Sequence, residues 1–347
     1  MATYYILLGS WLFYVYSLKF VLEKRISDTN ILLVFFPIIS LILIAGLRDA
    51  SVGTDTSAYL YAFDNANSLK FRSLEFGFSY FNYLFHNLGI NFQAFLIVIA
   101  FITISSLTWL IKSYSKNYFL SYYLYVTLGF YAFSMTGLRQ SIAVSLTMVA
   151  LIFLLRNKKI SFLLLVAIAS TFHISAIIFF LVPIFSKWKL SKNSAILFYL
   201  LSLSIFFISG PILNLMNELL PLSYILDYSN KGTSNPIVII VYGLIPLAAI
   251  IFWPRQQETQ IFSLLYIFSI LNFAIYIISL DIVMISRLGL YFSIYSIILI
   301  PNIINDLRSK DLRVIAMFLV LFLPLLMFAI STPGNSQGID KYSFGFW

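Results

Sequence analysis

Three arginines lie beside polar residues at the ends of separate apolar stretches, and their side chains are the first whose chemistry needs an explanation. They are Arg48, Arg139 and Arg287. A guanidinium stays charged and can bind two phosphate oxygens at once. Arg139 and Gln140 also stand where an apolar helix should begin, and the free N–H groups of a helix N-terminus favour an anion. Together these residues predict an outward-facing pocket for a diphosphate.

A local role for each arginine remains open. Arg48 could pair with Asp49, and Arg287 could pair with Asp281. Long cationic side chains also extend to lipid headgroups. The diphosphate hypothesis depends on all three arginines occurring at comparable positions, because charge at membrane depth is costly.

Carboxylates are the next candidates, since a carboxylate can act as a general acid or base on a sugar. Asp55 lies in the polar stretch GLRDASVGTDTSAY (46–59), and Glu75 precedes a second helix-like run. Asp55 could instead cap the helix that starts toward Tyr59. Glu75 could be only a favourable charge in a first helical turn. We expect Asp49 and Tyr59, in the same polar stretch, to contact the substrate.

His173 is one of two histidines and lies within the apolar stretch 160–185. A polar ring at membrane depth is costly, which favours a functional role. It could be a general base, a hydrogen-bond donor to a phosphate or a partner of a backbone carbonyl. Basic clusters flank the stretch on both sides, so we expect two half-length helices that meet near His173 as a re-entrant hairpin. We expect His86 to be a surface residue.

Several familiar chemistries lack their motifs. The chain contains no cysteine, which excludes disulfides and a cysteine nucleophile. It also contains no HExxH, GxSxG, P-loop or dinucleotide fingerprint. Zinc hydrolysis, α/β-hydrolase chemistry and NTP-driven transport therefore have no support. The net charge of +9 does not indicate nucleic-acid binding, because the basic residues are scattered through short loops.

Composition identifies the class of protein that must position these residues. Of 347 residues, 61% are hydrophobic and only 10% are charged. Apolar runs recur that are long enough for helices across a hydrocarbon core of about 30 Å. The fold class is therefore all-α, a polytopic transmembrane helical bundle.

We expect about ten full spans and one hairpin. The spans fall at about residues 2–18, 31–47, 91–111, 118–135, from Gln140 to about 155, 193–209, 237–253, 261–280, 287–304 and 314–330. Periodicity predicts an amphipathic helix near 74–88 in the outer interface. Most Lys and Arg residues fall in the loops that this topology places inside. The chain then forms a single membrane domain, 1–347, with larger outer segments at 48–90, 210–236 and 331–347.

Four motifs resemble the EpsG-like branch of the Wzy-type polysaccharide polymerases, a family that polymerises lipid-linked repeat units. In chain order they are GLRDASVGTDTSAY (46–59), EFGF (75–78), GLRQSIAVSL (137–146) and FHISA (172–176), with SRLGLYF (286–292) as a further match. The order and spacing of the motifs carry the resemblance, which covers roughly the first half of the chain.

The resemblance implies glycosyl transfer at the outer face of the bacterial cytoplasmic (inner) membrane. A glycan on undecaprenyl diphosphate would be the donor and another lipid-linked repeat unit the acceptor, giving O-antigen, capsule or exopolysaccharide. Arg48, Arg139 and Arg287 would bind the diphosphate, and His173 would be the base or a diphosphate contact. Asp55 or Glu75 would serve the acceptor or position an arginine. A chain-length regulator and a flippase are the expected partners, besides membrane lipid. We expect no cofactor, no metal and no nucleic acid.

Two other functions stay open. A flippase or transporter of lipid-linked oligosaccharides would carry basic residues on both faces of a central cavity. A polysaccharide ligase would use a similar outer Arg and His, with a long outer loop that has its own basic cluster. The outer segment 210–236 matches this description of a long, basic loop only modestly.

Overall fold

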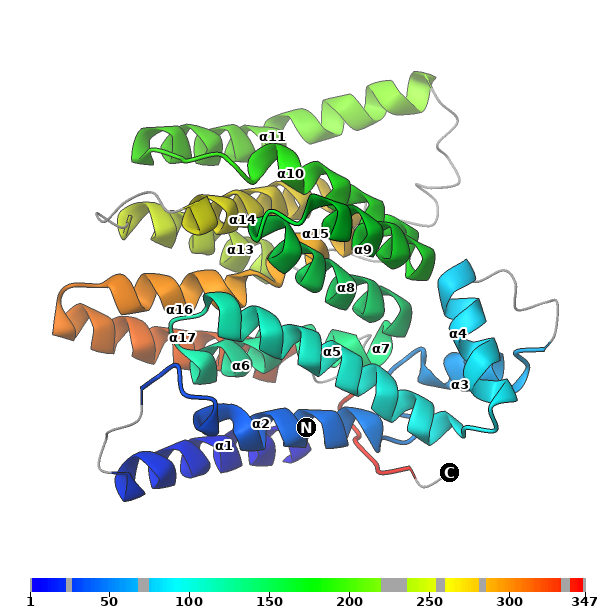
Figure 1. The fold of residues 1–347 in the computed structure, drawn as a ribbon. Coiled ribbons are helices and arrows are strands. Elements are labelled where there is room, and N and C mark those ends of the chain that lie inside the picture. Colours follow the sequence, from blue (N-terminus) through cyan, green and yellow to red (C-terminus); the bar gives the residue numbers. More distant parts are fainter. Residues whose placement is uncertain are drawn as a thin grey trace. The chain divides into compact units, whose positions relative to one another are not determined.

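The computed structural model describes residues 2–22, 27–67, 75–219, 236–253, 260–280, 285–331 and 338–345 (Figure 1). Within these ranges every regular element is a helix, and an isolated bridge joins Arg48 to Phe344. The all-α fold class is therefore confirmed. The chain divides into two compact units, residues 1–177 with 308–347 and residues 178–307.

The first unit contains the N-terminal helices and the last one. They are α1 (Ala2–Val21), α2 (Leu32–Gly46), α3 (Thr56–Asp64), α4 (Phe76–Asn87), α5 (Phe92–Tyr114), α6 (Tyr118–Thr127), α7 (Phe130–Thr136), α8 (Leu138–Leu155), α9 (Lys159–Phe172) and α17 (Lys310–Ser331). α5 packs against α2 and α8, and α8 packs against α9. These helices form the part of the molecule that positions the candidate site.

The second unit contains shorter and more broken helices. After the 3₁₀ helix Ile174–Leu181, in which the first unit ends, come α10 (Val182–Phe185), α11 (Lys192–Leu219), α13 (Pro236–Ile251), α14 (Gln260–Ile278), α15 (Ser286–Ser293) and α16 (Ser296–Asp306). α14 packs against α11, α13 and α15. Gly289 allows the last of these contacts, because a Cβ there would lie 2.8 Å from Asn272 Oδ1.

Five helices of the described chain are long and apolar enough to cross a membrane, or six if the bent pair α15 and α16 forms one span. The five are α1, α5, α8, α14 and α17. Three other expected spans, 31–47, 193–209 and 237–253, correspond to shorter apolar helices in α2, α11 and α13, and α9 corresponds to the first half of the expected hairpin. The structure thus supports a multi-pass membrane protein, and the count of ten spans is not confirmed.

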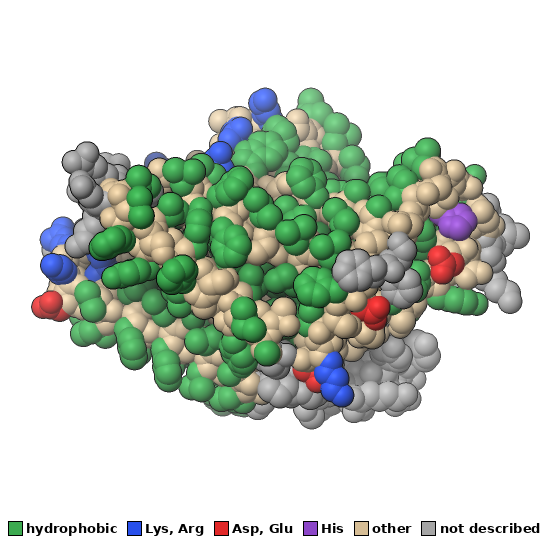
Figure 2. Space-filling model, turned by 90° about the horizontal axis from the view of Figure 1, so that it is seen from below, with side chains coloured by type: hydrophobic (Ala, Val, Ile, Leu, Met, Phe, Trp, Pro, Cys, Tyr) green, Lys and Arg blue, Asp and Glu red, His purple; other side chains and the backbone are tan. Residues whose placement is uncertain are grey.

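α1 and α17 expose large hydrophobic side chains, as helices in contact with lipid must. Phe13 and Phe20 on α1 are 74% and 76% exposed. Only 6% of the apolar stretch of α17 is buried. Figure 2 views the molecule from the side on which α1 and α2 lie in Figure 1. Hydrophobic side chains cover much of that face, and the charged ones lie mostly toward its margins.

Helix direction alternates along the first unit, so its polar motifs meet at one end. α2 and α7 end there, and α5 and α8 begin there. α9 starts at the opposite end, where α8 stops, and returns toward the motifs. Segments 46–59, 75–78 and 137–140 and residue 173 therefore lie at the same end of this unit, which we call the motif end.

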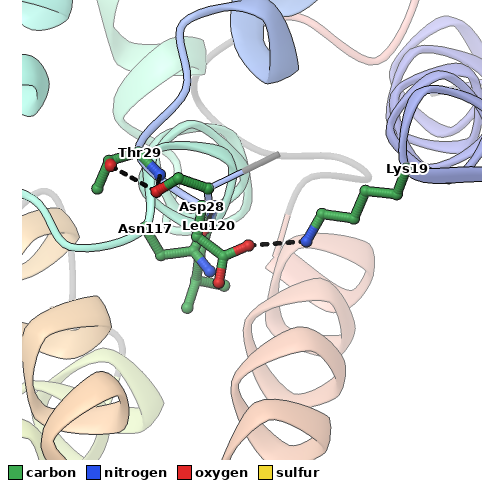
Figure 3. Close-up of polar contacts among 6 residues, drawn as sticks. Lys19, Asp28, Thr29, Asn117 and Leu120 are labelled. Atoms are coloured by element: carbon green, nitrogen blue, oxygen red, sulfur yellow. Dashed lines mark hydrogen bonds and ion pairs between the residues drawn. The ribbon is translucent and has the colours of Figure 1, made fainter. Parts of the chain in front are cut away.

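The opposite end of the first unit carries a second polar cluster (Figure 3). Lys19 Nζ lies 2.7 Å from Asp28 Oδ1, and the Asp28 carbonyl accepts a hydrogen bond from the Tyr118 N–H at 3.0 Å. Asn117 caps α6 by accepting from the Leu120 N–H at 2.9 Å. These contacts join the loop between α1 and α2 to the turn before α6. We call this the basic end, because Lys19, Lys112 and Lys116, three predicted inner lysines of this unit, lie here.

Three expected segments differ from the sequence prediction in detail. The fourth span is broken into α6 and α7, where Gly129 has a φ of 86°. α9 ends at Phe172, as the predicted break requires, and its 14 residues span only about 21 Å. The re-entrant path stays a prediction. α11 runs on to Leu219, past the expected end at 209, and residues 220–235 of the outer segment 210–236 lie outside the described residues.

The predicted interfacial helix exists as α4, but its apolar face is used differently. Helical spacing predicts an apolar face of Phe81, Leu84, Phe85 and Leu88 toward the membrane interface. Leu84 and Leu88 are indeed exposed, unlike Phe81 and Phe85. Both instead pack against Phe95 of α5, with ring centroids 5.2 and 5.5 Å away. Periodicity locates an apolar face correctly but cannot say whether protein or lipid covers it.

Candidate functional site

Glu75 joins Arg139 to His173 at the motif end of the first unit. Arg139 Nη1 donates a hydrogen bond to Glu75 Oε2, and His173 Nδ1 lies 2.8 Å from Glu75 Oε1. The three side chains are 29%, 20% and 16% exposed for Arg139, Glu75 and His173. They are therefore partly buried yet reachable. We call them the Glu75 cluster.

Each member of the cluster stands at a helix terminus. Glu75 occupies the N-cap position of α4, Arg139 is the second residue of α8, and His173 follows the last residue of α9. α4 packs on α9 closely because Gly77 has no side chain: a Cβ there would lie 2.3 Å from Thr171 Oγ1. Gly77 thus brings Glu75 within reach of His173.

The electrostatics of the cluster fix the state of the carboxylate. Partial burial raises the pKa of Glu75, but hydrogen bonds to His173 and the charge of Arg139 outweigh it and bring the pKa to about 2. Glu75 is therefore ionised at neutral pH. An ionised carboxylate accepts hydrogen bonds only, so His173 must donate from Nδ1. In the neutral imidazole this leaves Nε2 free to accept a proton.

Tyr59 lies next to Arg139. It is buried on α3, and its hydroxyl is within hydrogen-bonding reach of the Arg139 guanidinium. Burial raises the pKa of Tyr59, which the positive charge of Arg139 partly offsets. Asp55 holds the N-cap position of α3 but its exposed side chain makes no capping hydrogen bond. The capping explanation of Asp55 therefore finds no support, and its catalytic role stays a prediction.

Arg48 is placed differently from the other arginines. It is 1% exposed, and its guanidinium donates to the carbonyls of Ala45 and, at 3.0 Å, Met135. Burial lowers the pKa of Arg48 to about 10, which leaves it charged at neutral pH. These contacts tie the loop after α2 to the C-terminus of α7. A diphosphate contact by Arg48 stays a prediction.

Asp49 and Arg48 bind different partners, so the alternative of a local pair between them is not seen. Its Oδ1 accepts from the Ser51 N–H at 2.9 Å, and hydrogen bonds from Ser51 lower the pKa of this partly exposed carboxyl. The Arg48 guanidinium meanwhile binds backbone carbonyls. Asp49 therefore organises its own turn and remains open to solvent.

A C-terminal segment, residues 338–345, covers the same loop, which sequence reasoning missed. The N–H groups of Asp49 and Gly53 donate to the carbonyls of Ser343 and Gly338, both at 3.0 Å. The Gly345 N–H donates to the Leu47 carbonyl at 2.9 Å. These bonds are between backbone groups, so no pattern of side chains in the sequence could have predicted them.

Two further predicted residues remain to be placed. Gln140 is buried in the first turn of α8, next to Arg139. Arg287 is the second residue of α15 and is exposed, but it belongs to the second unit. Its expected role beside Arg139 stays a prediction.

The cluster provides an acceptor nitrogen and a cationic group within one small region. Such a pair can remove a proton from a hydroxyl and stabilise a negatively charged leaving group. Comparisons with curated proteins and with solved structures give no match. A family model described as the EpsG family matches residues 31–344. Because this match spans most of the chain, the chain belongs to the EpsG family.

Proposed function

We propose that this protein polymerises lipid-linked oligosaccharide repeat units at the outer face of the bacterial cytoplasmic membrane. The donor is a glycan on undecaprenyl diphosphate, and the acceptor is a second lipid-linked repeat unit. EpsG-family membership supports a polysaccharide polymerase in general. The observation that carries the proposal is the Glu75 cluster, which joins a histidine to an arginine at the motif end.

The reaction needs one proton acceptor and one stabilised leaving group. His173 Nε2 takes the proton of the acceptor hydroxyl as its oxygen bonds to the anomeric carbon of the donor. The bond from that carbon to the diphosphate oxygen breaks, and the lipid diphosphate leaves with the electron pair. Glu75 holds the imidazole in the required tautomer, much as a carboxylate orients the histidine of a hydrolase triad.

Arg139 supplies positive charge for the leaving diphosphate. Its guanidinium has several N–H donors, so it can bind a phosphate oxygen while it keeps its contact with Glu75. The N-terminus of α8, whose N-cap Gly137 has no side chain to satisfy the first-turn N–H groups, adds favourable electrostatics. The Tyr59 hydroxyl, a second hydrogen-bond partner of Arg139, helps to hold the guanidinium in place.

Complementation of a gene deletion tests this function. The deletion strain is restored with wild type, His173→Ala, Arg139→Ala or His86→Ala at matched protein level, and the surface polysaccharide is run on a gel. His86→Ala is the matched control, because this histidine contacts Phe63 rather than Glu75. We expect single-repeat glycan in the deletion, a full ladder with wild type and His86→Ala, and loss of the ladder with the other two variants.

The same gel separates the rival functions. If the deletion retains its ladder, polymerisation is not the task of this protein. If no repeat unit reaches the outer surface, a flippase fits better. If polymer forms but is not joined to its lipid core, a ligase fits better.

A further inference from the structure

Three aromatic side chains form an exposed row along α4. Phe76, Tyr80 and Tyr83 are 75%, 55% and 47% exposed. The rings of Phe76 and Tyr80 are nearly parallel, with centroids 6.1 Å apart and planes at 14°. Tyr80 and Tyr83 continue the arrangement at 6.4 Å and 27°. We call these three residues the aromatic row.

Packing within the first unit does not account for the row. α4 packs through its opposite side, where Phe78 is fully buried and Phe81 and Phe85 contact Phe95. Burying an aromatic side chain is strongly favourable, so three rings left in the open on one helix face need a partner, which is either lipid, as on α1 and α17, or a ligand.

The row begins at the candidate active site. Phe76 directly follows Glu75, whose carboxylate binds Arg139 and His173. A substrate whose reacting bond lies at this cluster would therefore have its neighbouring units within reach of α4. Figure 1 shows α4 at one end of the first unit, beside α3. It lies away from the basic end, where α5 and α8 stop.

We propose that the aromatic row is a glycan subsite, which binds the sugar rings of the lipid-linked substrate by stacking. This inference rests on the proposed function. One face of a pyranose ring presents C–H bonds, and these meet the negative face of an aromatic ring favourably. The two centroid spacings of the row are similar, 6.1 and 6.4 Å, so the row offers regularly spaced rings to a chain of sugars.

The chemistry of the row favours a sugar over a lipid tail. Two of its three rings carry hydroxyls, and Asn87 continues the same exposed face, so the rim of a sugar would find hydrogen-bond partners. By contrast, Val314, Ile315 and Phe318, which are exposed on α17, have wholly apolar side chains.

Substitutions that either keep the aromatic ring or replace it with an aliphatic side chain test the proposal. The full-length protein is purified in detergent and titrated with oligosaccharides of one to three repeat units, released by mild acid from the polysaccharide of the source strain. Binding is followed by saturation-transfer NMR. Tyr80→Phe and Tyr83→Phe keep the rings, and we expect affinity within about two-fold of wild type. Tyr80→Leu and Tyr83→Leu keep apolar bulk only, and we expect affinity about three- to ten-fold weaker for each.

Phe318→Leu is the matched control, because this ring is exposed on α17 and distant in sequence from the cluster. A row that only anchored α4 in the interface would tolerate leucine, so wild-type affinity in both leucine variants overturns the proposal. Equal losses in the phenylalanine and leucine variants overturn stacking as the mode of binding. Failure of the wild type to bind any of the oligosaccharides also overturns it.

The thermal midpoint of each variant confirms that it is folded. The outcome is separate from that of the complementation gel. A deletion strain that keeps its ladder refutes the polymerase while leaving a ring-dependent affinity intact. A polymerase whose row variants bind normally refutes the subsite alone.

Discussion

At the scale of single residues, Glu75 is the group on which the candidate chemistry depends. Its carboxylate contacts both Arg139 and His173, and its charge fixes the histidine tautomer. Glu75→Gln keeps the size and one acceptor oxygen but removes that charge. We expect the polysaccharide ladder to fall at least about ten-fold in intensity, because general-base catalysis is typically worth 10²–10⁴-fold and depends on the tautomer. A ladder of wild-type intensity would contradict the role of Glu75.

The depressed pKa of Glu75 also predicts how the cluster responds to acid. A carboxyl whose folded-state pKa is about 2, against an ordinary 4.5, contributes stability above the ordinary value and loses it as pH falls toward the folded value. We expect the difference in thermal midpoint between wild type and Glu75→Gln to be constant from about pH 7 to about pH 5 and to shrink below that. A difference that instead vanished between about pH 7 and about pH 6 would contradict the ion pair.

Substitution of Arg48 distinguishes a structural role of this side chain from a substrate-binding role. Arg48→Met would leave the carbonyls of Ala45 and Met135 without their charged donor. We expect a loss of about 1–3 kcal/mol, because the lost hydrogen bonds are partly offset by relief of a buried charge. Thermal unfolding in detergent measures this, and Arg48→Lys should fall between. Normal stability combined with a lost ladder would instead favour the diphosphate role.

The residues of the candidate site were largely predictable, and their contacts with one another were not. His173 stood out because a polar ring is costly at membrane depth, Arg139 because it lies at a helix N-terminus that favours an anion, and Glu75 because a carboxylate can act as a general acid or base. Their meeting depends on three helix ends separated by 64 and 98 positions in the chain, which no local pattern encodes. In sequence, Arg48 resembled the other two candidate arginines. In the structure it is buried, and the loop around it is held by a segment almost 300 residues away.

At the scale of elements, the site depends on the contact between α4 and α9. Gly77→Ala would place a Cβ 2.3 Å from Thr171 Oγ1 and 2.9 Å from the Thr171 carbonyl oxygen. The hydroxyl can rotate away but the backbone cannot, so we expect the helices to separate and the Glu75–His173 contact to lengthen. The expected result is a ladder reduced about ten-fold or more, since small misplacements of catalytic groups are costly.

Gly9→Ala is the control for that substitution. Gly9 lies within α1, and a Cβ there would meet no atom within 4 Å. It should leave both the ladder and the thermal midpoint unchanged. A Gly77→Ala protein that kept its full ladder would show that the α4–α9 spacing does not control the chemistry.

Helix existence followed from hydropathy, whereas helix faces and breaks did not. The long runs at α5, α8 and α14 are apolar on every side, so their burial could not be assigned from periodicity. The break at Gly129 needs a left-handed residue within an apolar run, which is a weak signal in sequence. The C-terminal segment 338–345 has no regular pattern, because it is held by its backbone.

At the scale of the whole molecule, orientation in the membrane is the property that the charge pattern predicts and side-chain contacts do not test. α17 nonetheless relates the two ends of the first unit. Its 22 residues span about 33 Å from Ser309, just before it, to the chain that leads into segment 338–345. Ser343 of that segment contacts the loop of Ser51 at the motif end. Ser309 and Ser51 must therefore lie on opposite sides if α17 crosses the membrane.

A chain without cysteine makes this testable with single reporters. Ser51 and Ser309 are both exposed, so Ser51→Cys and Ser309→Cys should each accept a maleimide. With a membrane-impermeant maleimide on intact spheroplasts, we expect labelling of Ser51→Cys at once and of Ser309→Cys only after permeabilisation, since basic loops stay inside. Ser145→Cys, at a fully buried position, is the unlabelled control.

The reverse pattern of labelling would put the Glu75 cluster on the cytoplasmic side, where a polymerase of exported repeat units could not act. Labelling of both serine positions from outside would instead show that α17 does not cross.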